Sequence, residues 1–78
     1  MKHTMLAVTR FTLTGGFYAE VMAQGDEVAF WLGHKDADVK EKMFALSAAL
    51  APDDRWETLL EDNCEEYMEE FSEAWLEE

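Results

Sequence analysis

Apolar and polar positions alternate along the first 33 residues of the chain, in three runs that glycine-containing pairs separate. The runs are rich in β-branched and aromatic residues and cover positions 4–14, 17–23 and 27–33. Between them lie Gly15–Gly16 and Gly25–Asp26, which have the composition of tight turns. The pattern predicts a three-stranded antiparallel meander over residues 4–33.

The register of these strands follows from keeping one face apolar, because a slip of one residue turns every side chain to the other face. With Leu13 opposite Phe17, Phe11 pairs with Ala19 and Arg10 with Glu20. A two-residue turn with glycine first, as a type II′ turn prefers, places the alternate residues of the third run on the same apolar face. The opposite face then holds Leu6, Val8, Tyr18, Met22 and Trp31. It is either a solvent face with scattered apolar residues or a dimer or partner contact centred on Trp31 and Tyr18.

The next segment has helical spacing. Val39, Met43, Leu46 and Leu50 form one stripe, Asp36 or Asp38 precedes it as a capping residue, and Pro52 ends it. The spacing predicts a helix over residues 38–51. Phe44 falls outside the stripe, so it packs against the helix that follows or is exposed for a partner.

The last third combines apolar periodicity with a high density of carboxylates. Residues at i, i+3, i+4 and i+7 spacing form an apolar stripe about 100° wide: Trp56, Leu60, Cys64, Tyr67, Phe71 and Trp75. The pattern predicts a second helix over residues 54–77, with Asp53 or Asp54 capping its start. The expected fold is α+β, a single domain over residues 1–78 in which a three-stranded meander carries a C-terminal helical hairpin on one face, in the order βββαα.

The net charge of −12 is concentrated in this predicted second helix. Residues 53–78 contain twelve carboxylates and a single cation, Arg55. Carboxylates four residues apart repel one another at a cost of a few tenths of a kcal/mol per pair, and no lysine relieves the repulsion. Twelve charges over about 39 Å of helix give roughly one per 3 Å, close to the one per about 3.4 Å of a single nucleic-acid strand.

Besides the acidic predicted helix, the sequence contains no catalytic, cofactor-binding or metal-binding motif that would indicate a function. His3 and His34 lie at a terminus and at a strand end, where titration in solvent is expected, and no nucleophile–base pair or phosphate loop is present. A di-iron site requires Glu-x-x-His pairs, and a Ca²⁺ loop requires glycine between alternating oxygen ligands. The sequence therefore predicts a non-enzymatic protein without a cofactor or a metal site.

The chain is expected in the cytoplasm. It has no transmembrane run or signal peptide, and one cysteine, Cys64, suits a reducing compartment and an inert buried thiol.

The carboxylates indicate a class of partner. Direct nucleic-acid binding is disfavoured because phosphate attracts Lys and Arg patches, whereas a carboxylate ridge attracts proteins with basic grooves. An acidic surface that serves solubility alone is the alternative. The residues predicted to bind the partner are Glu61, Asp62, Glu65, Glu66, Glu69, Glu70, Glu73 and Glu77, with Trp31 from the sheet. A module that dimerises or binds through the sheet face around Trp31 is the second hypothesis.

In profile the chain resembles small phage- or plasmid-encoded nucleic-acid mimics, including anti-CRISPR and anti-restriction proteins. The resemblance lies in the short length, the pI near 4.3, the expected compact α+β fold and the one-sided carboxylates of the C-terminal third. It implies a stoichiometric inhibitor in the host bacterial cytoplasm. Such an inhibitor occupies the nucleic-acid-contacting surface of a CRISPR effector or another defence protein.

Overall fold

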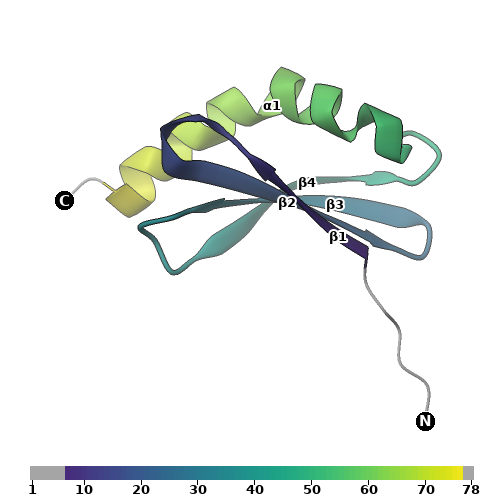
Figure 1. Ribbon diagram of the computed structural model, residues 1–78, viewed down its shortest axis with the longest axis horizontal. Coiled ribbons are helices and arrows are strands. Elements are labelled where there is room, and N and C mark those ends of the chain that lie inside the picture. The colour runs from purple at the N-terminus through teal and green to yellow at the C-terminus, as the bar shows by residue number, and fades with distance from the viewer. Residues whose placement is uncertain (1–6, 77–78) are drawn as a thin grey trace, which may run out of the picture.

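Four antiparallel strands and one long helix make up the computed structural model, which describes residues 7–76 (Figure 1). The strands follow one another in the sheet in chain order: β1 (Ala7–Thr12), β2 (Phe17–Gln24), β3 (Glu27–His34) and β4 (Lys40–Ser47). Helix α1 (Trp56–Phe71) follows a 3-10 turn and continues into a π-helical turn, Ser72–Leu76. The α+β class, the antiparallel sheet and the acidic C-terminal helix are confirmed.

The predicted strand register is confirmed at both turns. Phe11 pairs with Ala19, and Arg10 with Glu20. Across the second turn, Glu20 pairs with Trp31. Gly25 has a φ of +62°, and no residue other than glycine within 7–76 has a positive φ, so Asp26 does not, which is the pattern of the predicted type II′ turn.

The prediction of a helix over residues 38–51 is wrong, because this segment forms β4 as a fourth strand. Its sequence, KEKMFALS, is rich in good helix formers. A β-bulge opposite Phe30 and Trp31 also breaks its alternation, so a period of two is hard to see in it. The ends of the predicted helical stripe are exposed, since Val39 and Leu50 are 46% and 66% exposed, whereas Met43 is buried within β4. Pairing with the edge of β3 outweighs local propensity here.

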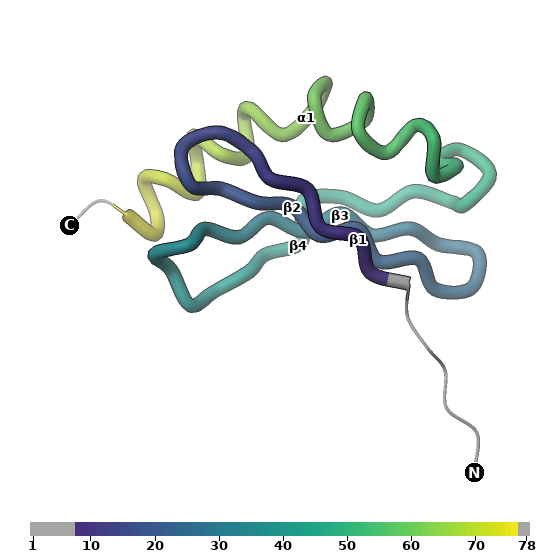
Figure 2. The backbone as a smooth tube through the Cα atoms, viewed as in Figure 1, coloured from purple at the N-terminus to yellow at the C-terminus, as the bar shows by residue number. Residues whose placement is uncertain are grey.

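Helix α1 covers one face of the sheet, and no other helix of the described residues covers the opposite face (Figures 1 and 2). The core lies between sheet and helix, where Phe30, Leu32 and Leu60 are almost fully buried. Burial of each such side chain contributes about 1.5–3 kcal/mol. The predicted stripe is confirmed for Trp56, Leu60, Cys64 and Phe71, which are all buried, while Tyr67 and Trp75 are half-buried.

A row of aromatic rings joins the sheet to the C-terminal half of α1. Phe30 stacks on Phe44 of β4 at 4.6 Å between centroids, Tyr67 follows at 6.2 Å, and Phe71 and Trp75 stack at 4.7 Å. Phe44 therefore packs against α1, one of its two predicted roles, although it does so from a strand. Offset aromatic pairs add about 0.5–1.5 kcal/mol beyond the area that they bury.

The start of α1 is held by a tryptophan and not by the predicted aspartate caps. Neither Asp53 nor Asp54 makes a side-chain cap, and both lie in the 3-10 turn before the helix. The indole Nε1 of Trp56 donates to the carbonyl of Ala51 at 2.8 Å in a buried hydrogen bond. This bond ties the first turn of α1 to the connection from β4.

His34 is buried, so the expectation of a solvent-exposed side chain at this strand end is wrong. The residue is only 5% exposed, and its imidazole ring lies edge-on to the ring of Phe17. Nδ1 accepts the backbone N–H of Asp36 at 3.0 Å, so Nε2 carries the proton and donates to the carbonyl of Gly15 at 2.8 Å. Gly16 has a φ of +85°, and a Cβ there would collide with this ring. His34 thus pins the β1–β2 turn.

Candidate partner-binding surface

The carboxylates of α1 point away from the sheet. Glu65, Glu69 and Asp62 lie opposite the buried stripe at 100° per residue. Every predicted acidic residue of the surface that the structure describes is exposed: Glu61, Asp62, Glu65, Glu66, Glu69, Glu70 and Glu73. Glu77 lies outside the described residues. We call these seven residues, together with Glu57 on the same helix, the acidic face.

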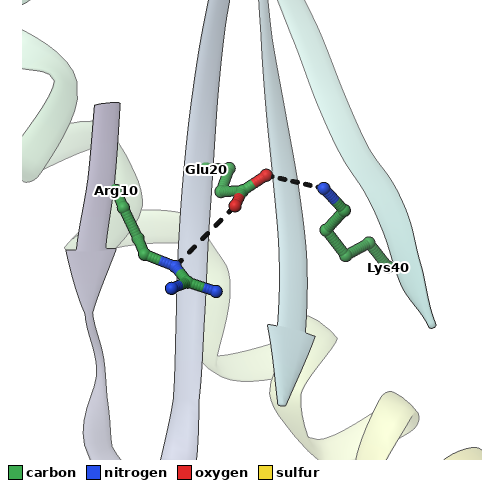
Figure 3. Close-up of polar contacts among 3 residues, drawn as sticks. All are labelled: Arg10, Glu20 and Lys40. Carbon is green, nitrogen blue, oxygen red and sulfur yellow. Dashed lines mark hydrogen bonds and ion pairs between the residues drawn. The ribbon is translucent and has the colours of Figure 1, made fainter. Parts of the chain in front are cut away.

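No carboxylate of the acidic face forms an ion pair with a cation of the described residues. Both ion pairs within residues 7–76 belong to Glu20 of β2, which lies 2.8 Å from Lys40 and 3.7 Å from Arg10 (Figure 3). Those three side chains lie on strands and face away from α1. Within residues 7–76, no ion pair therefore offsets the charge of the acidic face.

The spacing of these charges is regular. Glu61, Glu65, Glu69 and Glu73 form one row and Asp62, Glu66 and Glu70 a second, with about 6 Å of axial rise between neighbours in a row. The sixteen residues of α1 span about 24 Å and include seven of the eight carboxylates. The helix thus carries roughly one charge per 3.4 Å, which equals the density of a single nucleic-acid strand.

Unlike the acidic face, the open face of the sheet carries cationic and aromatic side chains. In the register, Arg10, Glu20, Trp31 and Lys42 form one row across the four strands, and Thr12, Tyr18, Gly33 and Lys40 form the next. The guanidinium of Arg10 lies 3.9 Å from the centroid of the Tyr18 ring, and this ring also lies so close to Gly33 that a Cβ there would collide with it. Trp31 is half-buried, and its Nε1 is buried without a hydrogen-bond partner among the described residues.

A groove that the sequence did not predict runs between the β1–β2 turn and α1. It consists of two adjoining cavities of about 400 and 250 Å³, which share Thr14, Glu65 and Met68. The turn rises from the sheet toward the helix (Figure 2). The sequence contains only an indirect indication of this groove: Met68 lies on the flank of the predicted stripe, and Gly15–Gly16 form a turn. Which flank of the helix this turn meets depends on how the helix crosses the sheet.

Cys64 lies at the base of this groove. It is 6% exposed. Burial, reinforced by the charges of Glu65 and Glu61, raises the pKa of the Cys64 thiol above its ordinary value. The thiol is neutral at physiological pH, and thiols are nucleophilic as thiolates, so this position supplies apolar lining.

Within residues 7–76, no three side chains of His, Cys, Asp and Glu gather closely enough to hold a metal ion. No helix in the same range is long and apolar enough to cross a membrane. Comparisons of the chain with known protein families, curated proteins and solved structures gave no significant match. Its function is therefore inferred from the surfaces described above.

Proposed function

We propose that this chain is a non-enzymatic inhibitor that binds the positively charged, nucleic-acid-contacting surface of a partner protein through its acidic face and blocks it. The observation that supports this proposal is the exposure of eight regularly spaced carboxylates that form no ion pair with a cation of the described residues. A field of this kind steers a basic partner into contact and makes association fast and salt-sensitive. By resemblance to small nucleic-acid mimics, the partner is a CRISPR effector or another defence protein.

The geometry of α1 favours this function over an acidic surface that serves solubility alone. Soluble surfaces intersperse charges of both signs, and this chain does so at Glu20. Its helix accepts like-charge repulsion at i, i+4 instead. The docking of α1 on the sheet fixes the helix backbone, so binding a partner does not require the helix itself to be ordered.

A triple charge reversal tests the proposal. The variant Glu66→Lys, Glu69→Lys, Glu73→Lys should abolish capture of the partner from the source cytoplasm at low salt. Duplex DNA should compete with the wild-type protein for the same partner. The matched control reverses three exposed acids outside α1, Asp26, Glu27 and Asp38, and so changes the net charge equally. Binding lost in the first variant and kept in the second supports the acidic face; equal binding by both contradicts it.

The open sheet face supports a second candidate, a protein-interaction or dimerising module. Its specific support is that no helix of the described residues covers this face, and that within residues 7–76 the indole N–H of Trp31 has no partner beneath its surface. Trp31→Ala and Tyr18→Ala would then abolish binding or dimerisation, with little dependence on salt. Light scattering at several protein concentrations measures the dimer directly. In the first proposal both substitutions leave capture by the acidic face intact.

A further inference from the structure

The groove between the β1–β2 turn and α1 has an apolar base and an acidic rim. Its base is formed by Leu13, Phe17, Cys64 and Met68, which are buried or half-buried. Exposed carboxylates of the acidic face stand along the helix side of it, at Glu61, Glu65 and Glu69, with threonine and serine hydroxyls beside them. No lining residue is a cation. The groove therefore offers apolar contact below and negative charge above.

These two properties fit one kind of side chain. Arginine has an aliphatic stem that packs on apolar surface and a charged head that stays near water. Its planar guanidinium presents five N–H donors and pairs with carboxylates in a bidentate manner. We propose that the groove anchors an arginine side chain of the basic partner, with the stem against Met68 and the guanidinium at Glu65. This inference rests on the proposed function and names the anchor point within that contact.

The groove is held in shape before any partner arrives. His34 donates to the carbonyl of Gly15, and the backbone N–H of Lys35 donates to the carbonyl of Gly16 at 3.0 Å. The turn that forms one wall is thus fixed to the end of β3, while α1 forms the other wall. Preformed sites bind more tightly because little ordering remains to be done.

Neighbouring glutamates provide a matched pair of variants. Glu65 lines both cavities, whereas Glu66, the next residue, lines neither. Each change to glutamine removes one charge from the same helix. A short arginine–glycine repeat peptide serves as the probe, with affinity measured by calorimetry at low salt. Glu65→Gln should weaken binding by about tenfold, as expected for loss of a hydrogen bond to a charged group, and Glu66→Gln by less than about threefold.

The outcomes separate this inference from the proposed function. Equal losses in the two variants would overturn the groove as the anchor and leave the acidic face as the contact. Absence of binding by the wild-type protein at low salt would overturn both. A lysine–glycine peptide that binds as tightly as the arginine peptide would overturn the assignment to arginine.

A second pair of variants fills the groove without changing charge. Thr14→Tyr places a ring in the space that both cavities share, and Thr58→Tyr places one on exposed helix surface outside it. The first should weaken peptide binding severalfold and the second should leave it unchanged, with circular dichroism confirming that both fold. If Thr14→Tyr binds the peptide as well as the wild type does, the groove is not the anchor.

Discussion

Glu20 of the sheet and the carboxylates of α1 differ in their surroundings. Glu20, at the centre of the open sheet face, is 15% exposed and has a cation on each side, Arg10 and Lys40. The carboxylates of the acidic face are exposed and have none among the described residues. Glu20, which is half-buried, is paired with cations of the same chain. The lack of such cations beside the acidic face, among the described residues, is therefore a feature of that surface and does not follow from the overall composition alone. The contrast supports the proposal that the helix is the part that meets a cationic partner.

The largest expected effect tests whether helix and sheet form one cooperative unit. Leu60 of α1 is 1% exposed and packs in the core, so Leu60→Ala should lower the free energy of unfolding by about 2–5 kcal/mol. Leu50→Ala, at a position 66% exposed, is the control and should change it by less than about 0.5 kcal/mol. Urea denaturation followed by circular dichroism measures both. A Leu60→Ala variant that keeps wild-type stability would mean that the helix is not docked.

The comparison also predicts opposite signs for the same substitution in the two regions. Glu20→Gln removes both ion pairs and should lower the free energy of unfolding by about 0.5–1 kcal/mol, a modest value because the two cations are largely exposed. Glu69→Gln relieves repulsion from Glu65 and Glu73 and should raise it by a few tenths of a kcal/mol. Thermal unfolding of both variants beside the wild type measures the difference. Two changes of the same sign would remove the contrast.

Salt should stabilise the fold for the same reason. At about 1 M salt the Debye length falls to about 3 Å, which screens the repulsion along α1 more than the close pairs at Glu20. The melting temperature in sodium chloride should therefore rise by a few degrees. A variant with Glu65, Glu69 and Glu73 changed to glutamine should respond less to salt. An equal response would place the origin of the salt effect elsewhere.

The smallest expected effect concerns the pH dependence contributed by Cys64. Its folded-state pKa is raised by burial above the ordinary 9.0, so the unfolded state loses the thiol proton first as pH rises. Stability is therefore lost above about pH 9, and is unaffected by this group well below it. The stability advantage of the wild type over Cys64→Ala should shrink between about pH 8 and pH 10. A constant difference across that range would contradict a buried neutral thiol.

Local signals predicted the elements whose pattern is regular. The turn at Gly25–Asp26 and the demand for one apolar face determine the register of β1 to β3, and the apolar stripe of α1 survives its high charge. The same signals failed for β4. Its lysine, glutamate, methionine, alanine and leucine residues favour a helix, and the bulge conceals its alternation. The segment forms a strand because it pairs with the edge of β3. This is a tertiary interaction, which the local sequence does not reveal.

The candidate surface likewise has features that the local sequence predicted and features that it did not. Exposure of the carboxylates follows from helical periodicity and was predictable one residue at a time. The groove depends on where the β1–β2 turn meets the helix. The role of His34 depends on the carbonyl of Gly15, which lies nineteen residues away in the sequence. Neither relation is local in sequence, so neither leaves a periodic pattern.

The placement of the three tryptophans gives the molecule an internal set of optical probes. Trp31 lies on the open sheet face, Trp56 at the buried start of α1 and Trp75 stacked on Phe71 beyond its end. Variants that keep one indole each would report the sheet face, the core and the helix end as separate fluorescence signals. Emission from Trp75 that shifts when a partner is added, while that from Trp31 stays constant, would locate the encounter on the molecule without any attached label.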